Sequence, residues 1–170
     1  KSPIAMRNNL LIGMSQSGKS TDLVEFARTA IESGAYFVAM TNDANSPLAQ
    51  LAHHHIDLGV GPELAVAATK SYSAQLLTSY LLVATWANLP INGESLIAEA
   101  EKLVNNVSLV SQAVEACSRE NETVVLGRGF AYPNAREAAL KIQETCKVSV
   151  QGLSTADYLH GPISALTPET

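Results

Sequence analysis

Short apolar runs alternate with longer stretches of helical periodicity along the first sixty residues. The apolar runs at 10–14, 36–40 and 56–58 predict three buried strands. Apolar residues at helical spacing predict a helix over 22–33 and a shorter one over 46–52. This alternation predicts a three-layer α/β/α fold, in which a parallel sheet carries helices on both faces and the crossovers are right-handed.

A different pattern follows residue 60. Residues 69–88 predict a helix that is apolar on most sides, which is typical of burial between layers or subunits. Residues 94–118 predict one long amphipathic helix. A strand at 123–126, a glycine loop and a helix at 132–146 then repeat the opening order. We therefore assign 1–118 to a first α/β unit with a connecting helix, and 119–170 to the start of a second.

The loop after the first strand contains two overlapping phosphate-binding patterns. Gly13 to Ser20 fit the nucleotide P-loop pattern G-x-x-x-x-G-K-S, whereas Ser15 to Ser20 form a hydroxyl-rich loop suited to a sugar phosphate. In both cases backbone N–H groups at a helix N-terminus would bind the anion. The loop thus predicts an anion site and leaves two kinds of anion open.

Two observations disfavour the nucleotide. A P-loop enzyme also needs an acidic residue at the end of a neighbouring strand to hold Mg²⁺. Here the strand at 36–40 ends in Thr41-Asn42, and Asp43 lies in the turn. Ser15 and Ser17 also occupy positions where a P-loop usually has glycine. A nucleoside triphosphatase is therefore the less favoured alternative.

Composition limits the partners and the compartment that we expect. The net charge is −5, so a nucleic-acid-binding surface is not expected. No apolar run reaches the about 18 residues of a membrane span, and no signal peptide precedes the first strand. The two cysteines, Cys117 and Cys146, are typical of reduced thiols in a cytoplasmic protein. No pattern indicates a cofactor.

The run His53-His54-His55 is the segment that most invites a metal interpretation. Adjacent histidines in an extended or irregular segment point in divergent directions, and no cysteine or carboxylate cluster accompanies them. We therefore predict no metal site, and we expect these histidines in a solvated or partner-facing loop.

Four segments, taken together and in order, resemble the sugar isomerase (SIS) domain family. This family includes the isomerase domain of glutamine–fructose-6-phosphate aminotransferase and stand-alone phosphosugar isomerases and deaminases. The resemblance covers essentially the whole chain, and it implies two tandem units with flavodoxin-like parallel sheets, both incomplete in this chain. The segments are SQSGKS at 15–20, ELAVAATK at 63–70, LGRG at 126–129, and EAALKIQE at 137–144 with LHGP at 159–162.

The resemblance implies that the loop at 15–20 binds the phosphate group of a sugar phosphate. Short hydroxyls and loop N–H groups suit phosphate oxygens. A purely structural alternative is that Ser15 and Ser20 cap the helix. Lys19 replaces a glutamate of the aminotransferase, and it either faces the phosphate or points into solvent. The implied substrate-binding residues are Ser15, Gln16, Ser17, Gly18, Ser20, Val66 and Ala68, of which Ala68 replaces a substrate-contacting serine of the family.

Isomerisation of a sugar phosphate moves a proton between C1 and C2, which one suitably placed carboxylate can do. Glu137, Lys141 and Glu144 share one helical face, a spacing that also fits a surface salt-bridge ladder. The resemblance implies that Glu144 is the acid/base and Lys141 a supporting residue. It also implies that His160 assists ring opening in the site of a neighbouring subunit, as part of a homodimer. As a lone histidine before Gly161-Pro162, His160 could instead be a turn residue.

These residues together predict an enzyme of the phosphosugar isomerase or deaminase type that acts on a hexose or amino-sugar 6-phosphate. The alternative is a SIS module that senses a sugar phosphate without converting it.

Overall fold

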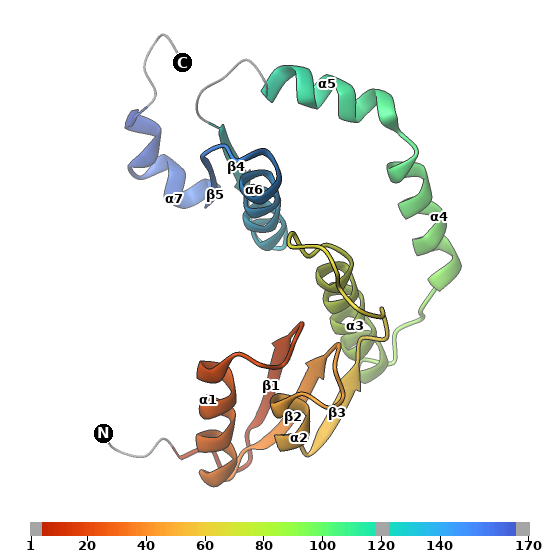
Figure 1. Cartoon of the computed structure of the whole chain (residues 1–170), viewed down its shortest axis with the longest axis vertical. Coiled ribbons are helices and arrows are strands. Elements are labelled where there is room, and N and C mark those ends of the chain that lie inside the picture. Colours follow the sequence, from red (N-terminus) through yellow and green to blue (C-terminus); the bar gives the residue numbers. More distant parts are fainter. Residues whose placement is uncertain (1–4, 118–122, 166–170) are drawn as a thin grey trace. The chain divides into compact units, whose positions relative to one another are not determined.

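The computed structural model describes residues 5–117 and 123–165 of the chain. The chain divides into two compact units, Lys1–Ile91 and Asn92–Thr170, and each contains a parallel sheet with helices (Figure 1). The predicted α/β class with parallel sheets is therefore confirmed. We predict that the first unit ends at residue 118, after the connecting helical segment, whereas the compact units divide before that segment, at Ile91. The tandem relationship of the two units stays a prediction.

The first unit contains three strands in the order β1-β2-β3, with β1 Leu10–Ser15, β2 Tyr36–Thr41 and β3 His54–Asp57. Both pairings are parallel, so the carboxyl ends of the strands lie at one edge of the sheet. Helices α1 (Thr21–Glu32) and α2 (Pro47–Leu51) form the two crossovers. Local signals set their ends: the Ser46 hydroxyl caps α2, and Gly34, at φ +95°, follows the end of α1.

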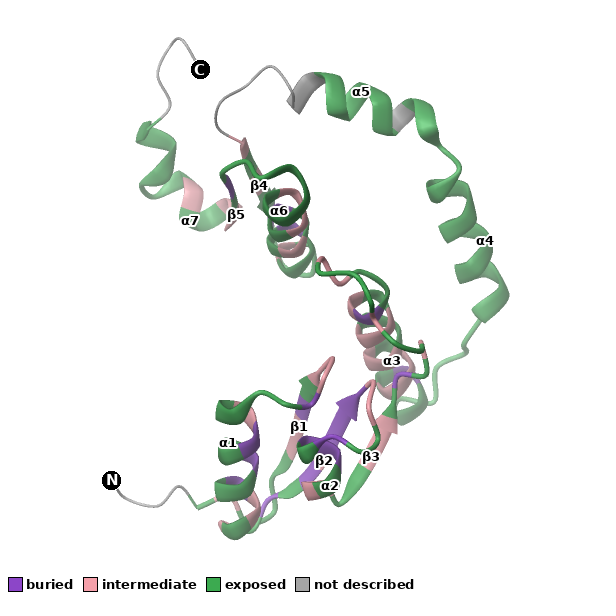
Figure 2. Ribbon diagram, viewed as in Figure 1, coloured by how far each residue is buried: buried purple, intermediate pink, exposed green. Residues whose placement is uncertain are grey.

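The core of this unit lies between one face of the sheet and the helices α1 and α2. Strand β2 is central and is the most buried strand (Figure 2). A side chain at Gly13 would come within 2.8 Å of the Phe37 ring, so this strand position has to remain small. The buried cluster consists of Val24, Ala27, Phe37, Ala39 and Leu48.

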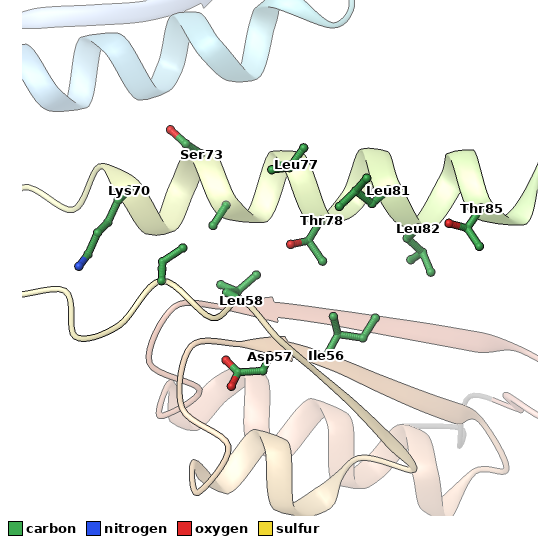
Figure 3. Close-up of a pocket in the computed structure, with 12 residues that line it drawn as sticks. Ile56, Asp57, Leu58, Lys70, Ser73, Leu77, Thr78, Leu81, Leu82 and Thr85 are labelled. Carbon is green, nitrogen blue, oxygen red and sulfur yellow. The ribbon is translucent and has the colours of Figure 1, made fainter. Parts of the chain in front are cut away.

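Helix α3 (Lys70–Trp86) lies over the opposite face of the same sheet (Figure 3). The Ser79 hydroxyl lies 4.0 Å from the Met14 sulfur of β1. In this helix only Ser71 and Ala84 are buried, and Trp86 remains 72% exposed. Within the described chain the helix is therefore not enclosed between layers, and burial between subunits stays a prediction.

The second unit contains a two-stranded parallel sheet of β4 (Thr123–Gly127) and β5 (Val150–Ser154), connected by helix α6 (Ala131–Cys146). A side chain at Gly152 would come within 2.6 Å of the α6 backbone, so the helix can pack closely because this residue is a glycine. The short helix α7 (Thr155–Leu159) and the 3₁₀ turn Pro162–Ala165 follow. The sequence pattern predicts β4 and α6 but no element after residue 146.

The amphipathic segment that we predict as one helix is two helices, α4 (Gly93–Val104) and α5 (Val107–Cys117). Asn105 is the C-cap of α4, and the side chain of Asn106 accepts a hydrogen bond from the Ser108 hydroxyl at 3.1 Å. Asparagine favours such local hydrogen bonds over helix continuation, which explains the break. No residue of α4 is buried. Among the helices of the described ranges, none has the length and apolar character needed to cross a bilayer.

Candidate functional site

The predicted phosphate loop lies between β1 and α1, at the carboxyl end of the first sheet, where open α/β sheets bind ligands. The Ser15 hydroxyl accepts a hydrogen bond from the Gly18 N–H at 3.0 Å. The Ser17 hydroxyl accepts one from the Lys19 N–H at 3.3 Å. Both hydroxyls thus stabilise the loop.

Gly18 determines the shape of this loop. Its φ of +63° is in the left-handed region, and a side chain here would collide with the Ser46 hydroxyl and lie 2.6 Å from the Ser46 Cβ. The Gly18 carbonyl accepts a hydrogen bond from the Leu48 N–H at 3.1 Å. The loop is therefore fixed against the start of α2 through its glycine.

Ser20 occupies the N-cap position of α1, but its hydroxyl makes no capping hydrogen bond. The residue is exposed. The structural alternative that its side chain caps the helix is therefore wrong for Ser20, whereas the Ser15 hydroxyl does have a structural partner within the loop.

The geometry departs from a nucleotide P-loop at both ends of the pattern. Strand β1 continues through Ser15, so Gly13 lies inside the strand and not in the loop. Helix α1 begins at Thr21, after the Lys19-Ser20 pair that would open the helix in a P-loop. The positions of the strand end and the helix start therefore disfavour a nucleotide P-loop.

A hollow of about 380 Å³ lies beside the loop. Three segments of the first unit form its walls: the phosphate loop, the turn after β2 and the turn that follows Gly61. Six of its eight lining residues are polar or charged, which suits a hydrophilic ligand. The lining residues are Gln16, Ser17, Lys19, Asn42, Asp43, Gly61, Pro62 and Glu63.

Asn42 joins all three walls of this hollow. Its backbone N–H donates to the Gln16 carbonyl at 3.0 Å. Its side-chain amide donates to the Gly61 carbonyl at 2.6 Å and accepts from the Val60 N–H at 3.2 Å. The sequence analysis assigns Asn42 only to a turn. The signal that could have identified it is a polar residue directly after a buried strand.

Glu63 anchors the third wall to the start of α3. Its carboxylate accepts hydrogen bonds from the Ser71 N–H at 3.1 Å and from the Ser71 hydroxyl at 3.0 Å. The bond from the Ser71 N–H is the main reason that the pKa of the Glu63 carboxyl lies below its ordinary value. The Lys70 ammonium donates to the Pro62 carbonyl at 2.8 Å, which closes the same turn.

The two substrate-binding residues predicted beyond the phosphate loop lie in this segment but do not line the hollow. Val66 is 97% exposed, and Ala68 is half-buried. The turn at 61–63 is tied down by hydrogen bonds, whereas the side chain of Val66 projects into solvent. The predicted contact of these two residues with a substrate, which for Val66 involves the backbone, therefore stays a prediction.

The predicted catalytic residues belong to the second unit. The Lys141 ammonium lies 2.7 Å from the Glu144 carboxylate and 3.4 Å from that of Glu137. The hydrogen bond to Glu144 is the main reason that the pKa of Lys141 is raised. The predicted shared face of α6 is thus confirmed, and its side chains form the salt-bridge ladder that was the structural alternative. A ladder and a catalytic group are compatible, because the pair also fixes the position of the Glu144 carboxylate.

His160 follows α7 as its C-cap residue, and its backbone N–H donates to the Asp157 carbonyl at 3.2 Å. The residue is exposed. Within residues 5–117 and 123–165, no hydrogen bond or ion pair joins His160 to Lys141 or Glu144. The structure brings Lys141 and Glu144 together and leaves His160 free of both.

Two of the three adjacent histidines lie in a strand and not in a loop, so the loop part of that prediction is wrong, whereas His53 and His54 are exposed as expected of a solvated segment. His54 and His55 are the first residues of β3. The His53 ring accepts a hydrogen bond from the Phe37 N–H at 2.9 Å and stacks on Tyr36. The His55 ring lies 2.9 Å from the Thr41 hydroxyl. In the described ranges, no group of three or more His, Cys, Asp or Glu residues is arranged to hold a metal ion.

A larger groove of about 860 Å³ lies between α3 and the segment from Ile56 to Val60 (Figure 3). Ile56 points toward the helix, and Asp57 points away from it. Most of the lining is aliphatic, including Leu77, Leu81 and Leu82. Because it presents few polar groups, this groove does not suit a phosphorylated sugar, and the smaller polar hollow is the better candidate for the functional site.

Comparison with known proteins finds a family match over the part of the chain that contains this hollow. Residues 3–85 match the SIS domain family. Over 162 residues the chain is 33% identical to the glutamine–fructose-6-phosphate aminotransferase of Sulfolobus acidocaldarius. This alignment covers 94% of the chain but 28% of the relative, so the chain spans less than a third of the length of that enzyme.

Two solved structures have the same fold. A protein of Silicibacter pomeroyi DSS-3, provisionally named a phosphosugar isomerase, is 38% identical with a TM-score of 0.78. The alignment covers 96% of this chain and 50% of that chain. The glucosamine-6-phosphate deaminase of Thermotoga maritima has a TM-score of 0.81 over 96% of this chain and 51% of its own, but at 22% identity it supports the fold alone.

Proposed function

Because the chain contains an SIS domain at residues 3–85 and is homologous to the isomerase domain of glutamine–fructose-6-phosphate aminotransferase and to phosphosugar isomerases, we propose that it binds a hexose or amino-sugar 6-phosphate and transfers a proton between C1 and C2. The observation that carries this proposal is the polar hollow beside the loop at 15–20. It combines hydroxyls, an amide and loop N–H groups at the carboxyl edge of a parallel sheet.

The phosphate group would bind at the loop. Ser17 and Gln16 line the hollow, and the exposed Ser20 hydroxyl has no capping partner to give up. The Ser15 and Ser17 hydroxyls each accept a hydrogen bond from the loop, and an O–H group can also donate to a phosphate oxygen. The loop therefore offers donors to an anion without losing the bonds that hold its shape.

Glu144 would transfer the proton. Lys141 holds its carboxylate at 2.7 Å and compensates its charge. A carboxylate in such a position can remove a proton from one carbon and return it to the neighbouring carbon on the same face, a role that contributes about 10²–10⁴-fold to rate. His160 would protonate the ring oxygen as the ring opens, and we propose that a second copy of the chain supplies it in a homodimer.

A Glu144→Gln substitution tests the catalytic role. We expect a loss of isomerase or deaminase turnover of about 10²–10⁴-fold with sugar-phosphate affinity retained, because the amide keeps the shape but cannot accept the proton. The matched control is Glu137→Gln, which removes the other carboxylate that pairs with Lys141 on the same helix. Wild-type turnover in Glu144→Gln would refute the role, and equal losses in both variants would mean that the ladder acts only in stability.

A sensing module is the second candidate. The observation that favours it is the ion pair of Glu144 with Lys141, because this pair explains the position of the Glu144 carboxylate without any catalytic role. Tight binding of glucosamine 6-phosphate without any product, measured by calorimetry and chromatography of the same samples, would favour this candidate. Binding of Mg-ATP in place of the sugar phosphate would contradict both. The choice between isomerase and deaminase, and the cytoplasmic location, remain parts of the proposal that product analysis and fractionation can test.

A further inference from the structure

The ion pair between Lys19 and Asp43 lies in the lining of the polar hollow. The Lys19 ammonium is 3.5 Å from the Asp43 carboxylate. Of the two positions left open by the sequence, the phosphate side and bulk solvent, Lys19 adopts the first in that it lines the hollow, although its side chain remains 65% exposed. The lysine is held by a carboxylate directly beside the proposed phosphate site.

The two partners of this pair are held very differently. One oxygen of Asp43 accepts a hydrogen bond from the Asn45 N–H at 2.9 Å, and the other faces Lys19. The Asp43 backbone is tied to the Thr41 hydroxyl through its carbonyl at 2.9 Å and its N–H at 3.3 Å. Asp43 is thus fixed by its own turn.

The Lys19 side chain is 65% exposed, and the Asp43 carboxylate is its one ion-pair partner among the described residues. An exposed pair at this distance is weak, because solvent screens it and the long side chain loses freedom on pairing. When a stronger anion enters the hollow, Lys19 is therefore the partner that can move, and Asp43 stays in place.

We propose that Lys19 is the phosphate-recognising cation of this site, and that it exchanges from the Asp43 carboxylate to the phosphoryl group when a sugar phosphate binds. This assignment rests on the proposed function. The Asp43 carboxylate pairs with the lysine in the lining of the hollow. A phosphate dianion has more charge and more acceptor oxygens than one carboxylate, so the lysine favours it. An unphosphorylated sugar offers no such exchange.

Two properties follow from this exchange. Lys19 contributes to the affinity for phosphorylated ligands and not to that for neutral sugars, so it determines specificity for the phosphate. Asp43 competes with the ligand for Lys19, so removing its charge strengthens phosphate binding. Because the effect of Asp43 depends on Lys19, the two substitutions are expected to be non-additive in a double-substitution cycle.

Calorimetry with the full chain and two probes, glucosamine 6-phosphate and inorganic phosphate, tests the proposal. We expect Lys19→Met to weaken both about tenfold, since one charge-assisted hydrogen bond is lost. We expect Asp43→Asn to strengthen both about threefold, and to do so much less in the Lys19→Met background. The matched control is Lys102→Met, which removes a similarly exposed lysine, also paired with a carboxylate, from the other compact unit.

The possible outcomes separate the two proposals. If both probes bind wild type and Lys19→Met equally, the Lys19 assignment is refuted while the sugar-phosphate site stands. If only inorganic phosphate binds, and Lys19→Met weakens it, the assignment stands and the proposed substrate is refuted. If neither probe binds wild type, both are refuted. An equal loss in Lys102→Met would mean that net charge alone is responsible, and would also refute the assignment.

Discussion

At the scale of single residues, the loop at 15–20 and the strand before it depend on two glycines as well as on serine hydroxyls. Gly18 combines a left-handed backbone with direct contact to Ser46, and Gly13 leaves room for the Phe37 ring. The hydroxyls of Ser15 and Ser17 accept hydrogen bonds from the backbone N–H groups of Gly18 and Lys19. The packing of the sheet explains Gly13, and the backbone of the turn explains Gly18. Neither glycine of the nucleotide pattern therefore indicates a bound nucleotide.

Substituting Gly18 by alanine tests this interpretation. We expect Gly18→Ala to lower the free energy of unfolding by about 2–4 kcal/mol, because backbone strain and a collision with Ser46 add together. Urea denaturation measures this loss. The control is Gly129→Ala, which shares the positive φ but has no atom within 4 Å of the new carbon, and should cost about 1 kcal/mol. Equal losses would show that crowding at Gly18 is negligible.

The sequence could not assign the partner of Lys19 or the three contacts of Asn42. Lys19 pairs with a residue of the turn after β2, and Asn42 contacts Val60 and Gly61, 18 and 19 positions further along the chain. Hydrophobic periodicity carries no information on such contacts. The salt bridge of Lys141 with Glu137 and Glu144 was predictable, because helical spacing alone places these side chains together.

At the scale of elements, the strands and helices of the first unit follow their local signals, and the exceptions have local causes. Strand β3 begins at His54, earlier than its apolar residues suggest, because pairing with Val38 and Ala39 of β2 extends it. The long predicted helix breaks at Asn105-Asn106. Strand β5 was not predicted, since Val150–Ser154 contains a glycine and two polar residues, and its place depends on pairing with β4.

The start of α3 gives a prediction on pH dependence. The pKa of Glu63 is below its ordinary value of 4.5, so the folded chain favours the carboxylate. Its stabilisation is fully present above that value and is lost as the pH falls through the lower folded pKa. We expect the melting temperature of wild type to fall more steeply below pH 4.5 than that of Glu63→Gln.

Thermal denaturation followed by circular dichroism, from neutral pH to about pH 3, measures this difference. Glu32→Gln, at the exposed end of α1, controls for the change in net charge. Parallel curves for wild type and Glu63→Gln would contradict the role of the carboxylate at the start of α3.

At the scale of the whole molecule, the two compact units carry different parts of the proposed chemistry. The first contains the polar hollow, and the second contains Lys141, Glu144 and His160. A homodimer in which His160 serves the site of the other copy predicts that two inactive variants can restore each other.

Mixing Glu144→Gln with His160→Ala tests that arrangement. Random exchange of subunits gives half heterodimers, each with one intact site, so we expect about a quarter of wild-type activity from two inactive preparations. Activity after co-refolding measures the recovery, and differently tagged chains confirm exchange. No recovery despite exchange would place His160 in the site of its own chain or outside any site.

The sequence by itself determined the α/β class, the positions of the first three strands, the position of the loop that we predict to bind an anion, and the shared face of Glu137, Lys141 and Glu144, because each depends on periodicity or on neighbours within a turn. Only the tertiary structure decided which loops meet. Parallel pairing brings the ends of β1 and β2 to one edge, so Asn42 joins the walls of a polar hollow and Asp43 holds Lys19 beside it. Contacts of this kind arise from the register between strands, which the pattern of one strand does not contain.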